Sequence, residues 1–108
     1  MYKVPELTDQ SFDREMREAP AAIVGFCSPG CPDVDRLAPV MEELAREYEG
    51  RVKFAVLDVC ENIDTPVELG VLGIPTLVFF KDGREVSRSF GPVKKRRVID
   101  AIRKNLRL

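Results

Sequence analysis

Hydrophobic and polar positions follow a strand pattern in five parts of the chain. Ala21 to Cys27 is a continuous apolar run between turn residues, which is typical of a strand buried on both faces. Asp82-Gly83 separates two further apolar segments and favours a β-hairpin, because glycine adopts a positive φ without strain. The pattern therefore predicts strands over residues 4–7, 21–27, 52–59, 76–80 and 85–90.

The segments between and after these strands have apolar residues at helical spacing. Phe12 and Met16 stand four residues apart in the first helical segment. In the longest segment, apolar residues recur at helical spacing from 37 to 48, with Pro39 inside and Gly50 placed to end the helix. Helices are predicted over residues 11–18, from 32 up to the stop at Gly50, over 65–69 and over 93–106. Alternating strands and helices are typical of an α/β protein.

Charge is distributed unevenly along the 108 residues. Residues 1–68 hold 7 basic and 15 acidic side chains and residues 69–108 hold 10 and 3, so the two parts carry −8 and +7. No aromatic side chain is interleaved with the cations near the end of the chain, so we predict a solvated helix face that complements the helix dipole, and no nucleic-acid partner. These cations are Lys94, Lys95, Arg96, Arg97, Arg103, Lys104 and Arg107.

The cysteine content limits the chemistry further. The chain has three cysteines, Cys27, Cys31 and Cys60, and no histidine, which disfavours a four-ligand structural zinc site and excludes a Cys–His catalytic pair. No apolar stretch approaches the roughly 20 residues of a membrane helix, and residues 1–6 lack the pattern of a secretory signal. We therefore expect a cytoplasmic protein without a metal site or a membrane contact.

The residues around Cys31 favour a reactive thiol. Pro32 suits the first position of a helix, which makes Cys31 the predicted N-cap, facing backbone amides and the positive end of the helix dipole. Both effects lower the pKa of the thiol and make its sulfur more nucleophilic. Asp33 opposes them by like-charge repulsion, so we expect only a modest decrease in the pKa.

Several motifs, in this order and spacing, resemble the thioredoxin family: Ala21–Phe26, Cys31-Pro32-Asp33-Val34, Leu37-Ala38-Pro39, Gly73-Ile74-Pro75-Thr76 and Lys81-Asp82-Gly83. The resemblance covers nearly the whole chain. It implies the thioredoxin fold, in which a central mixed β-sheet is flanked by helices on both faces. We expect residues 1–108 to form one such domain.

The resemblance also indicates where this chain departs from the family. Cys31 takes the place of the attacking cysteine, whereas Val34 stands where the family has its resolving cysteine in Cys-Gly-Pro-Cys. Mixed disulfides would form but would not be released in the usual way. Gly25 replaces the buried aspartate of the family and Val56 the lysine that pairs with it. The joint loss avoids leaving one unpaired charge in the core.

The other two cysteines also replace family residues. Cys27 takes the place of a tryptophan and Cys60 that of an aspartate, and the resemblance implies that these two side chains touch. Two alternatives stay open: a Cys27–Cys60 disulfide, or two small thiols of which each fills space. In either case both cysteines are candidates for resolving a mixed disulfide on Cys31.

The loop Gly73-Ile74-Pro75-Thr76 corresponds to the substrate loop of the family. The resemblance implies a cis Ile74–Pro75 bond, although only about 5–6% of such bonds are cis in folded proteins. It also implies that the backbone before Pro75 pairs with an extended substrate, and that Gly91-Pro92 completes an apolar rim around that substrate.

These observations support one leading hypothesis and two alternatives. The leading hypothesis is a thiol–disulfide oxidoreductase of the protein-disulfide reductase type with reduced activity, in which Cys31 attacks and Cys27 or Cys60 resolves. The first alternative is a redox-inactive protein-binding module that keeps the groove. Monothiol glutathione-linked chemistry is less favoured, because no cationic glutathione pocket is evident. We expect a monomer without a cofactor, a protein partner bound as an extended segment, and a thioredoxin-reductase-type reductant.

Overall fold

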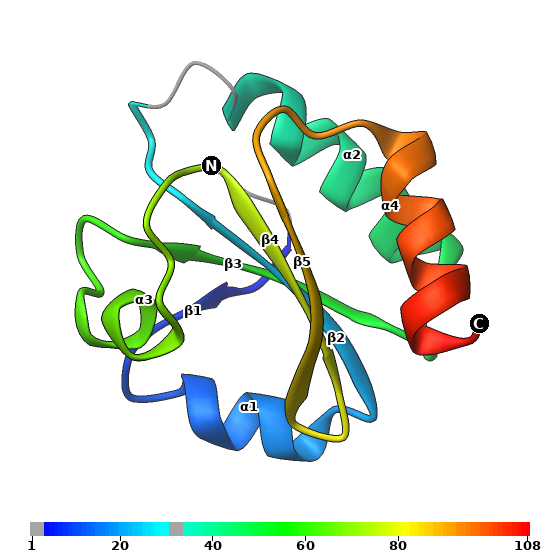
Figure 1. Ribbon diagram of the computed structural model, residues 1–108, viewed down its shortest axis with the longest axis horizontal. Coiled ribbons are helices and arrows are strands. Elements are labelled where there is room, and N and C mark those ends of the chain that lie inside the picture. Colours follow the sequence, from blue (N-terminus) through cyan, green and yellow to red (C-terminus); the bar gives the residue numbers. More distant parts are fainter. Residues whose placement is uncertain (1–3, 31–33) are drawn as a thin grey trace.

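The computed structural model describes residues 4–30 and 34–108, which form a mixed β-sheet between two layers of helices (Figure 1). The five strands lie in the order β1 (Glu6–Leu7), β3 (Lys53–Asp58), β2 (Ala21–Cys27), β4 (Thr76–Lys81) and β5 (Arg84–Phe90). β1, β3 and β2 run parallel, whereas β4 and β5 pair antiparallel. The prediction of an α/β fold with a mixed sheet and helices on both faces is confirmed.

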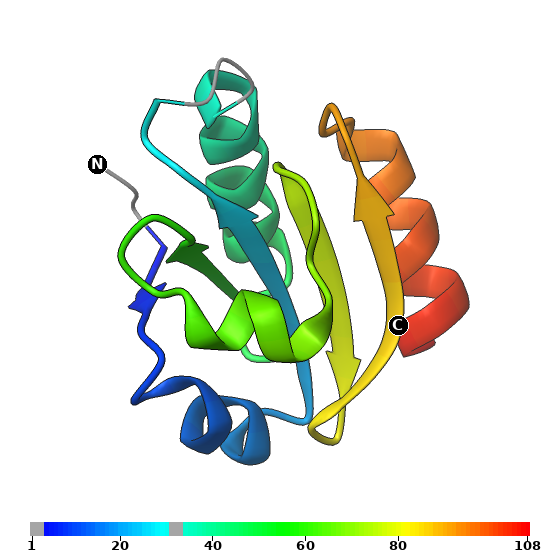
Figure 2. The same ribbon diagram turned by 60° about the vertical axis from the view of Figure 1, so that its left-hand side comes forward.

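Helices of the two layers pack on opposite faces of this sheet (Figures 1 and 2). The helical elements are α1 (Phe12–Glu18), α2 (Val34–Glu47), α3 (Asp64–Leu69), α4 (Lys95–Ala101) and the π-helical turn η1 (Ile102–Leu106). α2, α4 and η1 share one hydrophobic cluster with the sheet, and α1 contributes to a second cluster on the other face. No helix in the described part of the chain combines the length and the apolar character needed to cross a membrane.

β2 is the central strand and is buried along its whole length. Its side chains alternate between the two faces, as a strand requires. Ile23 and Cys27 belong to the cluster beneath α2, whereas Val24 and Phe26 belong to the cluster beside α1. The prediction of a strand buried on both faces is confirmed, and the residues at the end of β2 therefore have fixed positions.

Two of the differences between predicted and observed bounds change how an element begins or ends. The first strand was expected over residues 4–7 but pairs only over Glu6–Leu7, because Pro5 has no backbone N–H to donate to a ladder. The last helix was expected over residues 93–106 but begins at Lys95, after Lys94 in an extended conformation, and continues as a π-helical turn from Ile102. Its three predicted core residues, Val98, Ile102 and Leu106, are buried as expected.

The turn and the helix ends follow the predicted glycine positions. Asp82 and Gly83 have φ values of 52° and 80° between β4 and β5, which confirms the predicted hairpin. Gly70 ends α3 with a φ of 68°, a conformation that glycine adopts more easily than residues with a Cβ. Gly50 follows α2 with a φ of 81°.

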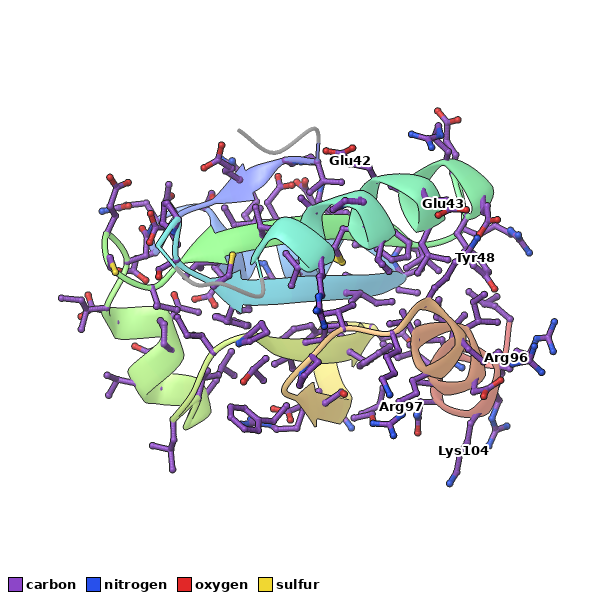
Figure 3. The ribbon with its side chains drawn as sticks, turned by 90° about the horizontal axis from the view of Figure 1, so that it is seen from above. Glu42, Glu43, Tyr48, Arg96, Arg97 and Lys104 are labelled. Carbon is purple, nitrogen blue, oxygen red and sulfur yellow. The ribbon has the colours of Figure 1, made fainter. Side chains whose placement is uncertain are left out.

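Cations of the last helix lie on its exposed side, as predicted. Figure 3 shows Arg96 and Lys104 extending away from the sheet. Lys95 instead contacts α2, where its Nζ lies 2.5 Å from a carboxylate oxygen of Glu43 and 3.2 Å from one of Glu47. These ion pairs raise the pKa of Lys95 and tie α4 to α2.

Candidate functional site

The end of β2 is tied to the turn that follows β3. Cys27, the last residue of β2, is fully buried on the face that α2 covers. It lies opposite Asp58 in the β2–β3 register, and the Val59 N–H donates to the Cys27 carbonyl oxygen at 2.9 Å. The end of β2 and the turn that contains Cys60 are therefore neighbours, whereas the predicted contact between the two cysteine side chains stays a prediction.

Cys60 lies in the turn after β3 and differs from Cys27 in its environment. Its N–H donates to the Asp58 carboxylate at 2.9 Å, and its side chain is exposed. The thiol of Cys60 is free, so no Cys27–Cys60 disulfide is present in this structure. Cys27 is buried in the core, whereas Cys60 is accessible to a reagent.

The predicted nucleophile Cys31 lies outside the described residues, as do Pro32 and Asp33. Its helix-capping position and its reactivity therefore stay predictions. α2 is described from Val34 onward, and its residues Leu37 and Met41 are fully buried against the sheet. The predicted proline inside this helix, Pro39, is confirmed.

Apolar groups surround Gly25, the residue that was predicted to replace a buried aspartate. Gly25 and Val56 are partners in the β2–β3 register, and Val56 is buried. A Cβ added to Gly25 would lie 3.4 Å from Leu37 Cδ1, 3.4 Å from Leu77 Cδ2 and 3.6 Å from Met41 Cε. The predicted apolar character of this region is confirmed for the residues that the structure describes around Gly25.

The loop before β4 has the predicted geometry. The Ile74–Pro75 peptide bond is cis, and the Thr76 hydroxyl donates to the Gly73 carbonyl oxygen at 2.6 Å. The Gly91 N–H donates to the Pro75 carbonyl oxygen at 3.0 Å, and Gly91 has a φ of 101° that favours glycine. This hydrogen bond joins the two segments that were predicted to form the rim.

The rim lies next to the end of β2. Thr76 pairs with Phe26 on one side and with Phe90 on the other. Pro75 is fully buried, Ile74 is half-buried and Pro92 is exposed. The structure thus brings together all the predicted substrate-loop residues, which are Gly73, Ile74, Pro75, Thr76, Gly91 and Pro92. Their role in binding a substrate stays a prediction.

A further set of residues beside this loop was not identified from the sequence. A hollow of about 330 Å³ opens next to Gly73, with two very exposed apolar side chains on its walls, Leu72 (99% exposed) and Phe90 (70% exposed). The lining residues are Gly70, Leu72, Gly73, Thr76, Arg88 and Phe90. One feature of the sequence could have indicated this hollow: the apolar Leu72 lies in a short connection between Gly70 and Gly73, where an apolar side chain is unusual.

Asp9 was also missed, and it holds the segment that follows Cys60. Its carboxylate accepts the N–H of Thr65 at 2.9 Å and that of Asp64 at 3.2 Å. Its own N–H donates to Asn62 at 3.0 Å. The Thr65 side chain first, and then the backbone N–H groups of Thr65 and Asp64, hold the pKa of Asp9 below its ordinary value.

Asp9→Asn is expected to lower the thermal midpoint by a few degrees at neutral pH, because it removes the charge from these hydrogen bonds. A lowered folded-state pKa contributes stability above the unfolded value of about 3.9 and loses it as the pH falls through the folded pKa. The difference from wild type should therefore disappear in acid, which circular dichroism melts across the pH range would measure. Glu68→Gln, at an exposed position of α3, is the matched control. An equal difference at all pH values would contradict this role for the charge.

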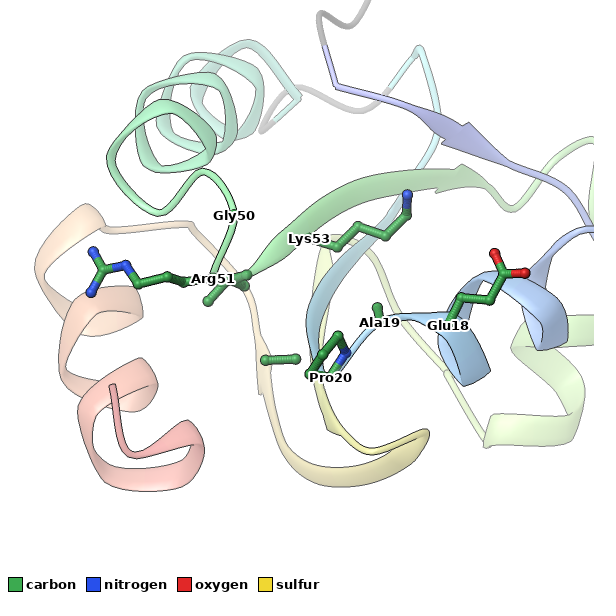
Figure 4. A pocket seen from close by; sticks show the side chains of 8 residues that line it. Glu18, Ala19, Pro20, Gly50, Arg51 and Lys53 are labelled. Atoms are coloured by element: carbon green, nitrogen blue, oxygen red, sulfur yellow. The ribbon is translucent and has the colours of Figure 1, made fainter.

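A separate hollow lies at the other ends of the parallel strands, where β2 and β3 begin (Figure 4). Its volume is about 270 Å³, and its lining mixes charges of both signs with proline and glycine: Glu18, Ala19, Pro20, Ala21, Gly50, Arg51, Val52 and Lys53. It contains none of the predicted site residues. Within residues 4–30 and 34–108, no three Cys, Asp or Glu side chains are grouped so that they could hold a metal ion.

Known proteins resemble this chain over most of its length. The family model for thioredoxin matches residues 3–104. A thioredoxin of Pseudomonas aeruginosa is 38% identical over 93 residues, which cover 85% of this chain and 86% of that protein. A thioredoxin of Staphylococcus aureus is 37% identical over 103 residues, which cover 95% of this chain and 98% of that protein. The similarity therefore includes both the sheet and the loops that form the candidate site.

Proposed function

The chain belongs to the thioredoxin family of thiol–disulfide oxidoreductases, and from this premise we propose that it reduces protein disulfides through Cys31, with Cys60 or Cys27 as the resolving thiol. The observation that carries the proposal is the position of the Pro75 loop beside the end of β2. Gly91 holds this loop, and Thr76 pairs it with Phe26 beside the end of β2. That arrangement supports the binding of an extended polypeptide next to the segment that contains Cys31.

The proposed reaction consists of two thiol–disulfide exchanges. The Cys31 thiolate attacks one sulfur of the substrate disulfide, a mixed disulfide forms, and the other substrate sulfur leaves as a thiolate. A second thiolate of the protein then attacks Cys31, so that a disulfide forms within the protein and the substrate leaves as a dithiol. A thioredoxin-reductase-type partner would supply the two electrons that restore the protein.

Burial favours Cys60 over Cys27 as the resolving thiol. Cys60 is exposed in a turn and carries a free thiol, whereas Cys27 is fully buried beneath α2. Exchange requires direct access of the attacking sulfur to the mixed disulfide. The Val59 N–H holds the segment before Cys60 against the end of β2, the strand that leads toward Cys31 in the sequence.

The test is to trap the mixed disulfide with an insulin substrate. In Cys27→Ser/Cys60→Ser, Cys31 attack should still occur, but the mixed disulfide should persist and be visible as a mass adduct on non-reducing analysis. Wild-type protein should accumulate much less of it, and Cys31→Ser should form none. Cys60→Ser alone should trap more than Cys27→Ser alone. Adduct formation that survives Cys31→Ser would show that another thiol attacks.

The same experiment separates the oxidoreductase from a binding module. The absence of a second cysteine at position 34 is the observation that favours a redox-inactive protein that keeps the groove. A module of that kind should retain its protein partner equally well in Cys31→Ser and in wild type, and neither should form an adduct. The cytoplasmic location and the monomeric state remain predictions.

A further inference from the structure

We propose that the hollow between Leu72 and Phe90 is a specificity pocket that takes one apolar side chain of the polypeptide bound in the groove. The pocket and the substrate loop share Gly73 and Thr76. The proposal rests on the proposed function, because the occupant belongs to the same protein substrate that presents a disulfide to Cys31.

The polar groups around the hollow are already used within the protein. The Arg88 guanidinium donates to both carboxylate oxygens of Glu85, at 2.6 and 2.7 Å, and this pairing raises its pKa. It also donates to the carbonyl oxygens of Leu69 at 2.6 Å and Gly70 at 3.2 Å. A polar ligand therefore gains little from Arg88, whose role is to fix the loop against β5.

The polar groups of the substrate loop also have hydrogen-bond partners within the protein. The Gly73 carbonyl oxygen accepts the Thr76 hydroxyl at 2.6 Å, so both groups have a partner. What remains toward solvent is the side chain of Leu72 and the ring of Phe90. Large exposed apolar side chains around a hollow indicate an interaction surface, and satisfied polar groups make the preferred occupant apolar.

Gly73 gives this pocket its shape. A Cβ at this position would lie 2.5 Å from Phe90 Cε1, so the ring rests directly on the glycine backbone. The absence of a side chain at Gly73 therefore lets the Phe90 ring lie against the substrate loop, where it forms one wall of the pocket. The volume of about 330 Å³ is near the lower limit of the roughly 300–1,000 Å³ typical of ligand sites, which suits one side chain.

The continuity with the groove determines where the occupant comes from. Phe90 directly precedes Gly91, which bonds to Pro75, and Leu72 directly precedes the loop. An extended chain bound along the Pro75 loop would therefore present a side chain near its reactive cysteine to the pocket, and the position of that side chain is determined by the experiment below. The inferred substrate class is therefore a disulfide-bearing segment with a leucine-like side chain at such a position.

The test uses short synthetic peptides with one cysteine held as a mixed disulfide with 2-nitro-5-thiobenzoate. The parent peptide has serine at the flanking positions, and leucine replaces serine at one position at a time, two to four residues on either side. Measurements are made in Cys60→Ser, so that this exposed thiol does not react. For at least one position, leucine should raise the second-order rate constant of thiolate release about tenfold or more over serine, the range that one apolar group gives in a fitted pocket.

Leu72→Ser and Phe90→Ser should each reduce this leucine-to-serine ratio toward one. Both side chains are largely exposed, so these variants should remain folded. Val86→Ser is the matched control, since Val86 is an exposed apolar residue of the same strand that does not line the pocket, and it should keep the wild-type ratio. A ratio near one at every leucine position, with normal thiolate release, would overturn the pocket and leave the proposed function intact.

A binding arm tests the pocket if Cys31 proves unreactive. Cys31→Ser is titrated with the leucine peptide, its cysteine replaced by serine, and amide shifts are followed by NMR. Shifts at Leu72, Gly73 and Phe90 that disappear in Phe90→Ser would support the pocket although the redox proposal had failed. A wild-type dimer in sedimentation that becomes monomeric in Phe90→Ser would identify a second copy as the occupant and overturn the proposal.

Discussion

Val34→Cys is expected to raise the turnover of insulin disulfides at least ~100-fold over wild type, because a thiol held beside the mixed disulfide reacts as an intramolecular nucleophile. Well-oriented groups of this kind reach effective molarities of about 10⁵–10⁸ M, far above any thiol in solution. In the proposed mechanism the resolving thiol of wild type is Cys60 or Cys27, which belong to other segments of the chain. The expected consequence is slow release of the mixed disulfide and low turnover.

The measurement is the rate of insulin reduction with dithiothreitol as reductant, compared between wild type, Val34→Cys and Val34→Ser. Val34→Ser introduces a side chain with the shape of cysteine but without a thiol, and it should stay at the wild-type rate. Adding Cys31→Ser to Val34→Cys should abolish the gain, since the attacking sulfur is then absent. Wild-type turnover equal to that of Val34→Cys would contradict the idea that the chain lacks an efficient resolving thiol.

Gly25→Asp is expected to destabilise the fold by about 3–5 kcal/mol at neutral pH, the effect of one uncompensated buried charge. The new carboxylate would lie among Leu37, Leu77 and Met41, whose methyl groups are 3.4–3.6 Å from the position of its Cβ. None of these groups can donate a hydrogen bond. The free energy of unfolding, measured with urea, is the quantity that reports this loss.

The pH dependence of that loss has a definite sign. Burial among apolar groups raises the pKa of a carboxyl, so the penalty on Gly25→Asp is small below the unfolded value of about 3.9 and grows as the pH rises toward the folded pKa. The difference between Gly25→Asp and Gly25→Ala should therefore be larger at neutral pH than in acid. Gly25→Ala itself should change stability by less than about 1 kcal/mol, because its Cβ makes ordinary contacts.

A double-mutant cycle tests whether the two family positions act as a pair. Gly25 and Val56 face each other in the β2–β3 register, so an aspartate and a lysine at these positions can interact. Val56→Lys alone should also be strongly destabilising, and the double variant should lose clearly less than the sum of the two single variants. Additive losses would contradict the pairing of the two positions, and a Gly25→Asp variant as stable as Gly25→Ala at neutral pH would contradict the apolar environment around Gly25.

The local sequence pattern was sufficient to predict those elements whose structure depends on a short stretch of chain. The continuous apolar run of β2, the Asp82-Gly83 turn and the Gly70 helix end depend on periodicity and on backbone preferences of single residues, and all three were predicted correctly. The resemblance to a family added the cis Ile74–Pro75 bond and the assembly of the substrate loop with Gly91, which no periodicity reveals.

The tertiary structure alone decided which distant side chains meet. Asp9 binds the backbone of Thr65 across 56 positions, and Arg88 fixes the turn at Gly70 across 18. A hydrogen bond of this kind forms only after the sheet has brought both segments together, so no local pattern predicts it. The same reason explains why two cysteines with equal chemistry in the sequence differ in the fold: Cys27 faces the core beneath α2, and Cys60 follows the end of a strand into solvent.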